Sequence, residues 1–279
     1  MKIKNIDQLK AKIQNLSLQT QQPSQILLRQ FMIEQFLVQV SQSRYKDQFI
    51  LKGGTFLVLA FGIAARSTVD IDGTLTDFDL NHENVEKMLK EILLSKNMDG
   101  ITFEITSIKS IMLNEVGDGL RVTMIAYFAN TRTHFYLDLS TGHPITPQAQ
   151  DFTFQTCIDH ETIQVKTYNF ETQIAEKLDA ILYRGILTSR MKDFYDITFI
   201  YLYQRDKVSL KVLKLAFKAT LQSRQHTQVL LNIEQNINTI LMSEQLMSLW
   251  RRYQAKFVYA QTMTLQEVSS ALIYWCNAL

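Results

Sequence analysis

The spacing of apolar and polar residues near the start of the chain predicts two consecutive helices. Apolar residues recur at helical spacing over residues 6–17, with polar side chains between them. A second helix is predicted over residues 24–41, with Ser24 as its N-cap. This second helix is more apolar, so we expect it to pack on a sheet while Glu34 stays solvated.

Further along, the pattern changes to short apolar runs and alternating segments separated by turn residues, which predicts a sheet. Strands are expected over residues 48–51, 102–113, 120–128, 134–139 and 151–158, with helices over 55–61 and from about 81 to 97. Turn clusters fall at 115–119 and 129–132. Consecutive strands with so few helices between them indicate an antiparallel arrangement.

From residue 170 onward the spacing is helical throughout. Helices are predicted over residues 170–187, 189–203, 210–221, 229–241, 243–257 and 264–276. Segregated strands followed by segregated helices predict the α+β class. We therefore expect an α+β domain over residues 1–165 and a C-terminal α-helical domain over residues 166–279.

Charge is nearly balanced overall but unevenly distributed. The formal net charge is only +2, so no global basicity indicates a nucleic-acid partner. From Glu171 onward there are 13 Lys and Arg residues against 9 Asp and Glu, which leaves 16 against 18 before it. This mild asymmetry is compatible with contacts to RNA and does not require them.

Two further features bear on the compartment. The cysteines, Cys157 and Cys276, lie far apart without metal-ligand spacing, as expected of thiols in a reducing compartment. The N-terminus lacks the apolar core of a signal peptide, and the longest apolar run, residues 56–65, is too short to span a bilayer. We expect a cytoplasmic protein without a membrane partner.

The first candidate for chemistry is the pair Asp70 and Asp72. On an extended segment both side chains lie on the same face, because strand side chains alternate with a period of two. Paired carboxylates supply the hard oxygen ligands that Mg²⁺ prefers. The alternative is a solvated strand edge or a loop. Gly73 follows directly, so the strand is expected to bend after the pair.

The second candidate is the pair Gly53 and Gly54, between a predicted strand and a predicted helix. Glycines at such a junction let backbone N–H groups approach an anion, and the helix N-terminus adds partial positive charge. Two adjacent glycines also occur in ordinary tight turns. Together with the acidic pair and with Arg66 between them, they suit a nucleotide triphosphate bridged by metal, as in phosphoryl or nucleotidyl transfer.

These motifs resemble a known family. Lys52-Gly53-Gly54-Thr55 followed by Arg66-x-Thr68-x-Asp70-x-Asp72 is similar to the signature of the AbiEii/AbiGii nucleotidyltransferase toxins, a branch of the polymerase-β-like nucleotidyltransferases. A second block, from Glu171 through Lys177 and Arg184 to Arg190-Met191-Lys192-Asp193-Phe194-Tyr195-Asp196, resembles the family's other hallmark. The resemblance implies a nucleotidyltransferase-like mixed sheet with flanking helices, and a helical domain that contributes to the active site.

The resemblance also implies roles for residues outside the first signature. Asp138, on the predicted strand 134–139, corresponds to a third metal-binding carboxylate; the alternative is that it caps the turn at residues 141–144. Lys177 and Asp193 correspond to active-site residues, whereas periodicity alone would place them on a solvated helix face. Asp193 is expected to orient Lys177 or Arg190, or to act as a base.

The activity implied by the resemblance is Mg²⁺-dependent transfer of a nucleoside monophosphate from an NTP to an acceptor hydroxyl, with two Mg²⁺ ions. Asp70, Asp72 and Asp138 would hold metal, and Asp70, Asp72, Lys177 and Asp193 would be catalytic. The nucleotide would contact Gly53, Gly54, Thr55, Arg66, Thr68, Lys177 and Arg190. RNA, in particular a tRNA 3′ end, is the expected acceptor.

The family further implies a toxin of a toxin–antitoxin or abortive-infection system, used in phage defence and neutralised by a cognate antitoxin. Two other classes of function stay open. One is a module that binds nucleotide or antitoxin without transfer activity. The other is an enzyme that modifies protein, by nucleotidyl transfer or as a kinase.

Overall fold

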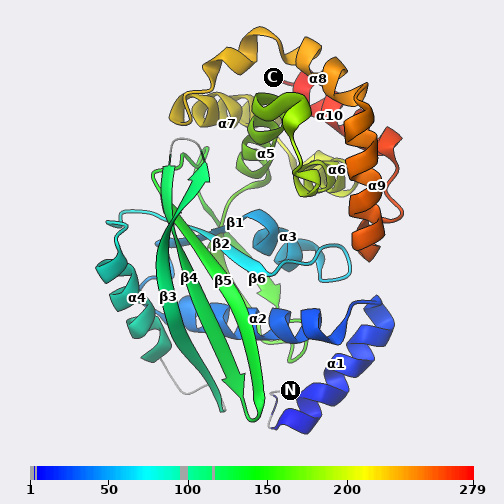
Figure 1. The fold of residues 1–279 in the computed structure, drawn as a ribbon. Coiled ribbons are helices and arrows are strands. Elements are labelled where there is room, and N and C mark those ends of the chain that lie inside the picture. The colour runs from blue at the N-terminus through cyan, green and yellow to red at the C-terminus, as the bar shows by residue number, and fades with distance from the viewer. Residues whose placement is uncertain (1–2, 4, 95–99, 115–116) are drawn as a thin grey trace. The chain divides into compact units, whose positions relative to one another are not determined.

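A seven-stranded mixed sheet forms the centre of the first of two units. The structure is a computed structural model that describes residues 3, 5–94, 100–114 and 117–279 (Figure 1). The first unit comprises Met1–Gly142 and Gln150–Thr167, and the second comprises His143–Ala149 and Tyr168–Leu279. The strands are β1 (Phe49–Lys52), β2 (Asp70–Leu75), β3 (Ile101–Asn114), β4 (Gly117–Phe128), β5 (Thr131–Thr141), β6 (Gln150–Gln155) and β7 (Thr162–Thr167).

Strand order in the sheet is β3-β4-β5-β2-β1-β7-β6, so β2 lies at the centre. It pairs antiparallel with β1 and parallel with β5. The strands β3, β4 and β5 form an antiparallel meander, and β7 pairs parallel with β1 and antiparallel with β6. A strand with neighbours on both sides is held rigidly, which makes β2 a suitable support for functional side chains.

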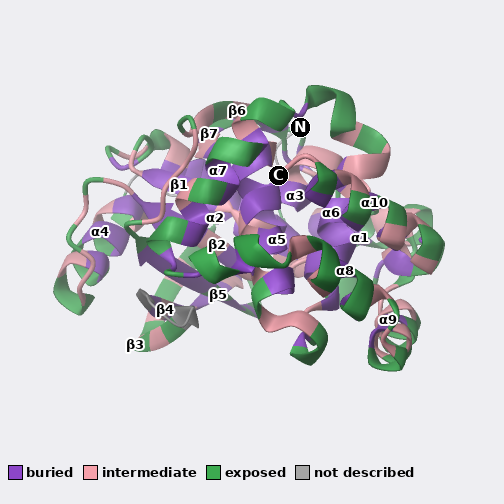
Figure 2. Cartoon of the chain, turned by 90° about the horizontal axis from the view of Figure 1, so that it is seen from above, coloured by how far each residue is buried: buried purple, intermediate pink, exposed green. Residues whose placement is uncertain are grey.

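Helices of the first unit are α1 (Ile6–Thr20), α2 (Ser24–Gln42), α3 (Gly53–Phe61) and α4 (His82–Leu94). The helix α2 packs against β5 and β7 and is buried over residues 30–40, seen in purple in Figure 2. The ring of Phe36 meets the rings of Phe49, Phe103 and Phe135 at centroid distances of 6.0–6.4 Å. These edge-on and tilted contacts join the helix to the sheet.

The second unit is helical. Its helices are α5 (Phe170–Arg184), α6 (Met191–Gln204), α7 (Leu210–Ser223), α8 (Ile233–Leu241), α9 (Glu244–Lys256) and α10 (Leu265–Asn277), with short 3₁₀ turns η1 (Gly185–Leu187), η2 (Arg205–Lys207), η3 (Thr227–Leu231) and η4 (Val258–Ala260). Trp250 and Trp275 are buried, and the Trp275 indole N–H donates to the Ile197 carbonyl at 3.0 Å. Within the described residues, every helix of either unit is too short or too polar to cross a bilayer.

The predicted α+β class, with a mixed sheet and a helical C-terminal part, is confirmed, and most elements form where the pattern predicts them. The N-cap prediction for Ser24 is wrong, because Pro23 occupies that position and Ser24 is the first helical residue. The strand β7 was not predicted. Its side chains alternate between exposed or half-buried and fully buried, but the segment is only six residues long and carries polar residues at four of its positions.

The turn predicted at 129–132 is also wrong in length. Ala129 and Asn130 alone form the turn, and Thr131 already pairs with Phe128. The predicted turn at 115–119 lies partly outside the described residues, and β4 begins at Gly117. A two-residue connection shifts the register of the β4–β5 hairpin relative to a four-residue one, which changes every cross-strand pair along it.

The expected bend at Gly73 does not occur, since β2 continues to Leu75. A Cβ atom on Gly73 would lie 3.2 Å from the Phe49 ring and 3.3 Å from the Leu139 side chain. Glycine here therefore allows the neighbouring side chains to close over the centre of the sheet.

Glu34, expected to be solvated, is buried in α2. Its carboxylate accepts hydrogen bonds from the Gln30 side chain at 2.9 Å and from the Cys157 backbone N–H at 2.8 Å. Burial raises the pKa of Glu34 to about 7, although both hydrogen bonds act in the opposite direction. Helical periodicity missed it because α2 is buried on nearly all sides in its middle.

The raised pKa of Glu34 predicts a pH-dependent stability. The folded state binds the Glu34 proton more tightly than the unfolded chain, so this contribution is fully present below pH 4.5 and is lost as the pH rises through about 7. Over that window we expect the unfolding free energy of the wild type to fall by about 2–3 kcal/mol more than that of Glu34→Gln, which has no carboxyl proton to lose. Urea titrations at pH 5 and pH 7.5 measure it. Exposed Glu83→Gln is the control, and equal pH slopes for wild type and Glu34→Gln would contradict the assignment.

Candidate functional site

The centre of the sheet presents two carboxylates on one face. Asp70 and Asp72 are half-buried and flank Ile71, which is fully buried, so the two aspartates share the opposite face of β2. Asp72 lies directly opposite Asp138 of β5 on one side and opposite Lys52 of β1 on the other. The sheet register thus places the acidic residues of two strands side by side.

The glycine pair lies against this acidic face. Gly53 has a φ of +61°, in the left-handed region, and a Cβ there would lie 2.2 Å from Oδ2 of Asp72. A Cβ on Gly54 would approach the Thr68 hydroxyl at 3.2 Å and the Arg66 guanidinium at 3.3 Å. The main chain at the start of α3 therefore touches the residues that the sequence analysis grouped with it.

Two threonines hold the start of β2: Thr55 of α3, and Thr68 of the loop between α3 and β2. The Thr55 hydroxyl donates to the Asp70 carbonyl at 2.9 Å, and the Thr68 hydroxyl donates to the same oxygen at 3.0 Å. Arg66 is buried and donates to the Ser67 carbonyl. The structure therefore brings together all seven candidates of the first signature: Gly53, Gly54, Thr55, Arg66, Thr68, Asp70 and Asp72. The two threonine hydrogen bonds hold Asp70, the first residue of β2, in place.

Asp138 is held by an arginine that the sequence analysis missed. Arg121 of β4 lies directly opposite it, and its Nε and Nη2 donate to the two carboxylate oxygens, each at 2.7 Å. Asp138 lies inside β5, three residues before its end, and both of its oxygens bind Arg121, so the alternative of a cap for the 141–144 turn is wrong. The Arg121 guanidinium also lies over the Tyr136 ring, 5.2 Å from its centroid.

The donor set at this face fits a divalent cation through Asp70 and Asp72. Both carboxylates lie on the same face of β2, and the Gly53 main chain lies close to Asp72. Within the described residues no group of three or more His, Cys, Asp or Glu side chains is arranged to hold a metal ion. Asp138, engaged by Arg121, does not complete such a group in this structure.

A second cluster of charges lies in the helical unit and contains the other predicted residues. The Lys177 ammonium of α5 lies 2.6 Å from Asp196 and 3.2 Å from Asp193, both on α6. Arg190 pairs with the other oxygen of Asp193. All but Arg190 are buried, with the two aspartates at most 2 % exposed.

This cluster determines what Asp193 can do. Burial alone would disfavour the charged carboxylate, but the charges of Lys177 and Arg190 outweigh it and hold the pKa of Asp193 well below its ordinary value. A carboxylate with so low a pKa is a weak proton acceptor. Of the two roles considered for Asp193, the electrostatics favour the orientation of its two cations.

Two residues of these clusters were not assigned a role from the sequence. Asp196 follows Asp193 at i+3, so their shared helix face was a usable signal. Arg121 is placed opposite Asp138 only by the two-residue turn at 129–130. With the longer turn predicted from the sequence, the register differs and Arg121 does not lie opposite Asp138.

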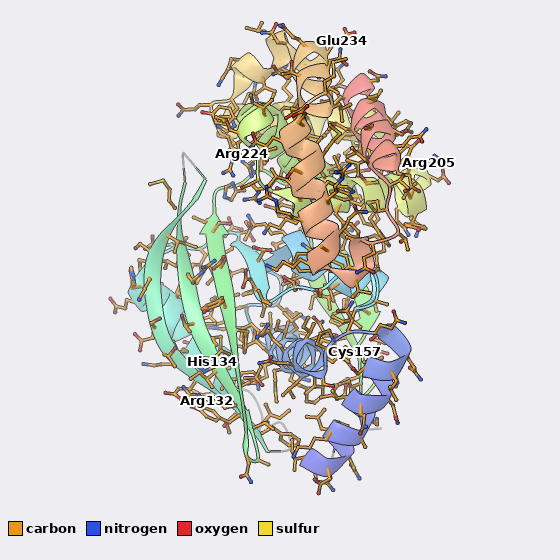
Figure 3. All side chains as sticks on the ribbon, turned by 45° about the vertical axis from the view of Figure 1, so that its right-hand side comes forward. Arg132, His134, Cys157, Arg205, Arg224 and Glu234 are labelled. Atoms are coloured by element: carbon orange, nitrogen blue, oxygen red, sulfur yellow. The ribbon has the colours of Figure 1, made fainter. Side chains whose placement is uncertain are left out.

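Other buried charges in the helical unit are paired with one another. Asp179 accepts from Arg224, labelled in Figure 3, at 2.8 Å, and lies 2.7 Å from Nδ1 of His226. The His226 ring stacks on Tyr183 at a centroid distance of 3.5 Å. This set joins α5 to the end of α7 and the start of η3, and we regard it as structural.

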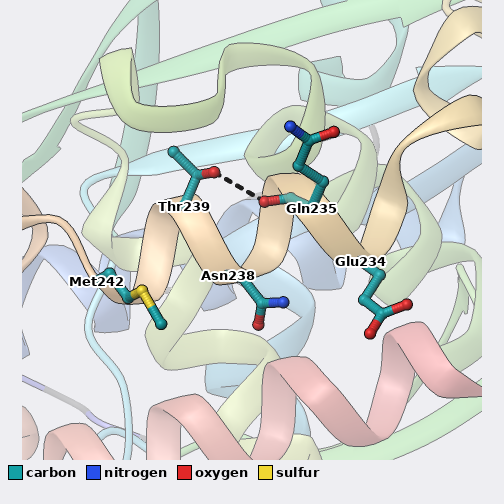
Figure 4. A pocket seen from close by; sticks show the side chains of 5 residues that line it. All are labelled: Glu234, Gln235, Asn238, Thr239 and Met242. Atoms are coloured by element: carbon teal, nitrogen blue, oxygen red, sulfur yellow. Dashed lines mark hydrogen bonds between the residues drawn. The ribbon is translucent and has the colours of Figure 1, made fainter.

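A shallow hollow of about 370 Å³ lies on α8 (Figure 4). Its lining residues are Glu234, Gln235, Asn238, Thr239 and Met242. None of the five carries a positive charge, and the Thr239 hydroxyl already donates to the Gln235 carbonyl at 2.8 Å. The lining therefore has no feature suited to a triphosphate.

The family model described as "Nucleotidyl transferase AbiEii toxin, Type IV TA system" matches residues 35–272, which include both charge clusters. The chain belongs to the AbiEii nucleotidyl transferase toxin family. As an AbiEii toxin it is a nucleotidyltransferase, and its membership of a type IV toxin–antitoxin family implies an antitoxin partner. The family predicted from the two sequence blocks is thus confirmed.

The chain is similar to several solved structures, and the first of them shares its fold. JHP933 from Helicobacter pylori matches with a TM-score of 0.54 and 15% identity, over 91% of each chain. A putative nucleotidyltransferase from H. pylori matches with a TM-score of 0.49 and 15% identity, over 92% of this chain and 95% of the other. A nucleotidyltransferase-like protein from Paracoccidioides brasiliensis matches with a TM-score of 0.37 and 14% identity, over 72% and 92%. No protein of curated function matches the chain.

The contact between Gly53 and Asp72 predicts an unequal response of two glycines to the same substitution. Gly53→Ala and Gly142→Ala both place alanine at positive φ, but a Cβ at Gly142 meets nothing within 4 Å, whereas at Gly53 it collides with Asp72. We expect Gly142→Ala to cost about 1 kcal/mol of unfolding free energy and Gly53→Ala about 1–2 kcal/mol more. Chemical denaturation measures both, and equal losses would show that the loop is not seated on Asp72.

Proposed function

We propose that this AbiEii toxin transfers a nucleoside monophosphate from an NTP to a hydroxyl of RNA, with Mg²⁺ as cofactor. The observation that carries the proposal is the contact between the Gly53 main chain and the Asp72 carboxylate, with Asp70 on the same face of β2. A glycine pair at the first turn of a helix, beside paired carboxylates, suits a triphosphate whose charge is shared between the helix N-terminus and metal.

In this proposal Asp70 and Asp72 hold a divalent cation. When bound, that cation would act as a Lewis acid on the reacting phosphate and stabilise the charge of the departing pyrophosphate. Gly53, Gly54, Thr55, Arg66 and Thr68 remain the proposed contacts of the nucleotide in the first unit. Lys177 and Arg190 remain its proposed cations in the second unit, where Asp193 and Asp196 position Lys177.

An RNA acceptor is supported by the surface of α7. Lys211, Lys214 and Lys218 are exposed and spaced three and four residues apart, so they form a row on one helix face, opposite buried Leu213 and Phe217. At 1.5 Å per residue the row is about 10 Å long, enough to meet successive phosphates of one strand. The helix carries no acidic residue, although the whole chain is nearly neutral. A protein acceptor is the second candidate.

The transfer reaction predicts labelling of RNA that depends on Asp70. Purified protein is incubated with total RNA, Mg²⁺ and each α-³²P-labelled NTP in turn, as wild type, Asp70→Asn or Asp77→Asn. The exposed Asp77 follows the same strand and is the matched control. We expect RNA labelling by wild type and Asp77→Asn, and a loss of about 10²-fold or more for Asp70→Asn, because a metal ligand is removed.

Other outcomes of this assay separate the alternatives. Label in protein bands would identify a protein acceptor, and release of ADP in place of pyrophosphate would identify a kinase. Binding of nucleotide with no labelled product from any NTP would support a binding module without transfer activity. Label that Asp70→Asn leaves unchanged would contradict the proposed metal site.

The lysine row predicts a salt-dependent contribution to RNA binding. We expect the triple variant Lys211→Gln/Lys214→Gln/Lys218→Gln to bind total tRNA more weakly and to lower the slope of log K against log salt by about 2, because three phosphate contacts are lost. Fluorescence anisotropy at several salt concentrations measures both quantities. The control removes three exposed lysines from the first unit, Lys46, Lys87 and Lys109. Equal slopes for the two triple variants would contradict the assignment of the row.

A further inference from the structure

The pair formed by Arg121 and Asp138 raises a question about how many carboxylates this face offers to a cation. Both oxygens of Asp138 accept from Arg121 in a two-pronged geometry, at 2.7 Å each. This is the geometry in which guanidinium binds carboxylate most strongly. A divalent cation at Asp138 would lie close to the guanidinium charge, which disfavours it. Arg121 and a metal ion therefore compete for the same side chain.

The two partners differ in their freedom to move. The Asp138 side chain is 8 % exposed and lies inside a strand paired on both sides, whereas the Arg121 side chain is 41 % exposed. Separation of the pair therefore requires only that the arginine swing outward, while Asp138 stays beside Asp72. The guanidinium of an arginine stays charged at any working pH, so Arg121 keeps its positive charge when it leaves Asp138.

Arg121 also has an alternative partner of suitable chemistry. Guanidinium binds phosphate with the same two-pronged geometry as carboxylate. Arg121 lies opposite Asp138, which lies opposite Asp72, and the charge of Asp70 also acts on the guanidinium. A phosphate group delivered to this face would draw Arg121 from Asp138 and release the third carboxylate.

We infer that Arg121 is a positioning residue that withholds Asp138 from the metal, so that the resting site offers two carboxylates and gains the third only when Arg121 leaves. The inference rests on the proposed metal at Asp70 and Asp72 and goes beyond it, because it assigns a regulatory role to a residue outside both sequence signatures.

Metal binding tests the inference without any need for turnover. Mn²⁺, which replaces Mg²⁺ at oxygen sites, is titrated into the full-length protein, and the free ion is followed by electron paramagnetic resonance. The variants are Arg121→Gln, Asp138→Asn, the double variant, Asp72→Asn and Arg132→Gln. Arg132, labelled in Figure 3, lies on the neighbouring strand β5 and controls for the loss of one positive charge.

We expect Arg121→Gln to bind Mn²⁺ about tenfold more tightly than wild type, because a buried carboxylate becomes available. Asp138→Asn is expected to bind as wild type does, since Arg121 already occupies that side chain, and the double variant is expected to lose the gain. Arg132→Gln is expected to change the affinity less than twofold, because the general electrostatic effect of one exposed charge is small. A dose of inorganic triphosphate should tighten Mn²⁺ binding by wild type more than by Asp138→Asn.

Two results would overturn the inference. One is equal Mn²⁺ affinity of wild type and Arg121→Gln, with thermal unfolding confirming that both are folded. The other is a loss of Mn²⁺ binding in Asp138→Asn as large as in Asp72→Asn, which would make Asp138 an ordinary ligand of the resting site. If RNA labelling succeeds while either result is found, the inference fails alone. If neither wild type nor Arg121→Gln binds Mn²⁺, the proposed metal fails with it.

Discussion

Parallel pairing of β2 with β5 is the constraint on which the candidate site depends. It places Asp72 beside Asp138, with Asp70 two residues away on the same face. Like charges so close raise the free energy of the folded state unless cations or dipoles balance them. The structure balances Asp138 with Arg121, and it seats the Gly53 main chain against Asp72. Asp70 and Asp72 are half-buried, and they are the carboxylates of this face proposed to hold an external cation.

In the helical unit, buried carboxylates are balanced by lysine and arginine side chains of the same unit. Lys177 is enclosed by Asp193 and Asp196, and Asp193 is shared with Arg190. Buried carboxylates are stable only when they are paired, and the pairing here also keeps Asp193 ionised. A lysine held between two carboxylates has a fixed position, which suits the phosphate contact proposed for Lys177.

Family and fold agree with this physical description without replacing it. Membership of the AbiEii toxins rests on a match over residues 35–272, and the likeness to JHP933 concerns the fold. Neither explains why Arg121 lies opposite Asp138. That arrangement follows from the β4–β5 register, which places Arg121 directly opposite Asp138.

The sequence by itself determined the features that depend on neighbours along the chain. Spacing of two on β2 aligned Asp70 with Asp72, spacing of three and four located the helices, and the glycine pair marked the junction between β1 and α3. Tertiary structure decided the features that depend on register and burial. A two-residue turn, in place of the four residues predicted, brought Arg121 to Asp138, and packing on nearly all sides of α2 buried Glu34. Periodicity reports which face a residue occupies, but the partner across a strand is set by turn geometry and packing, to which distant parts of the chain contribute.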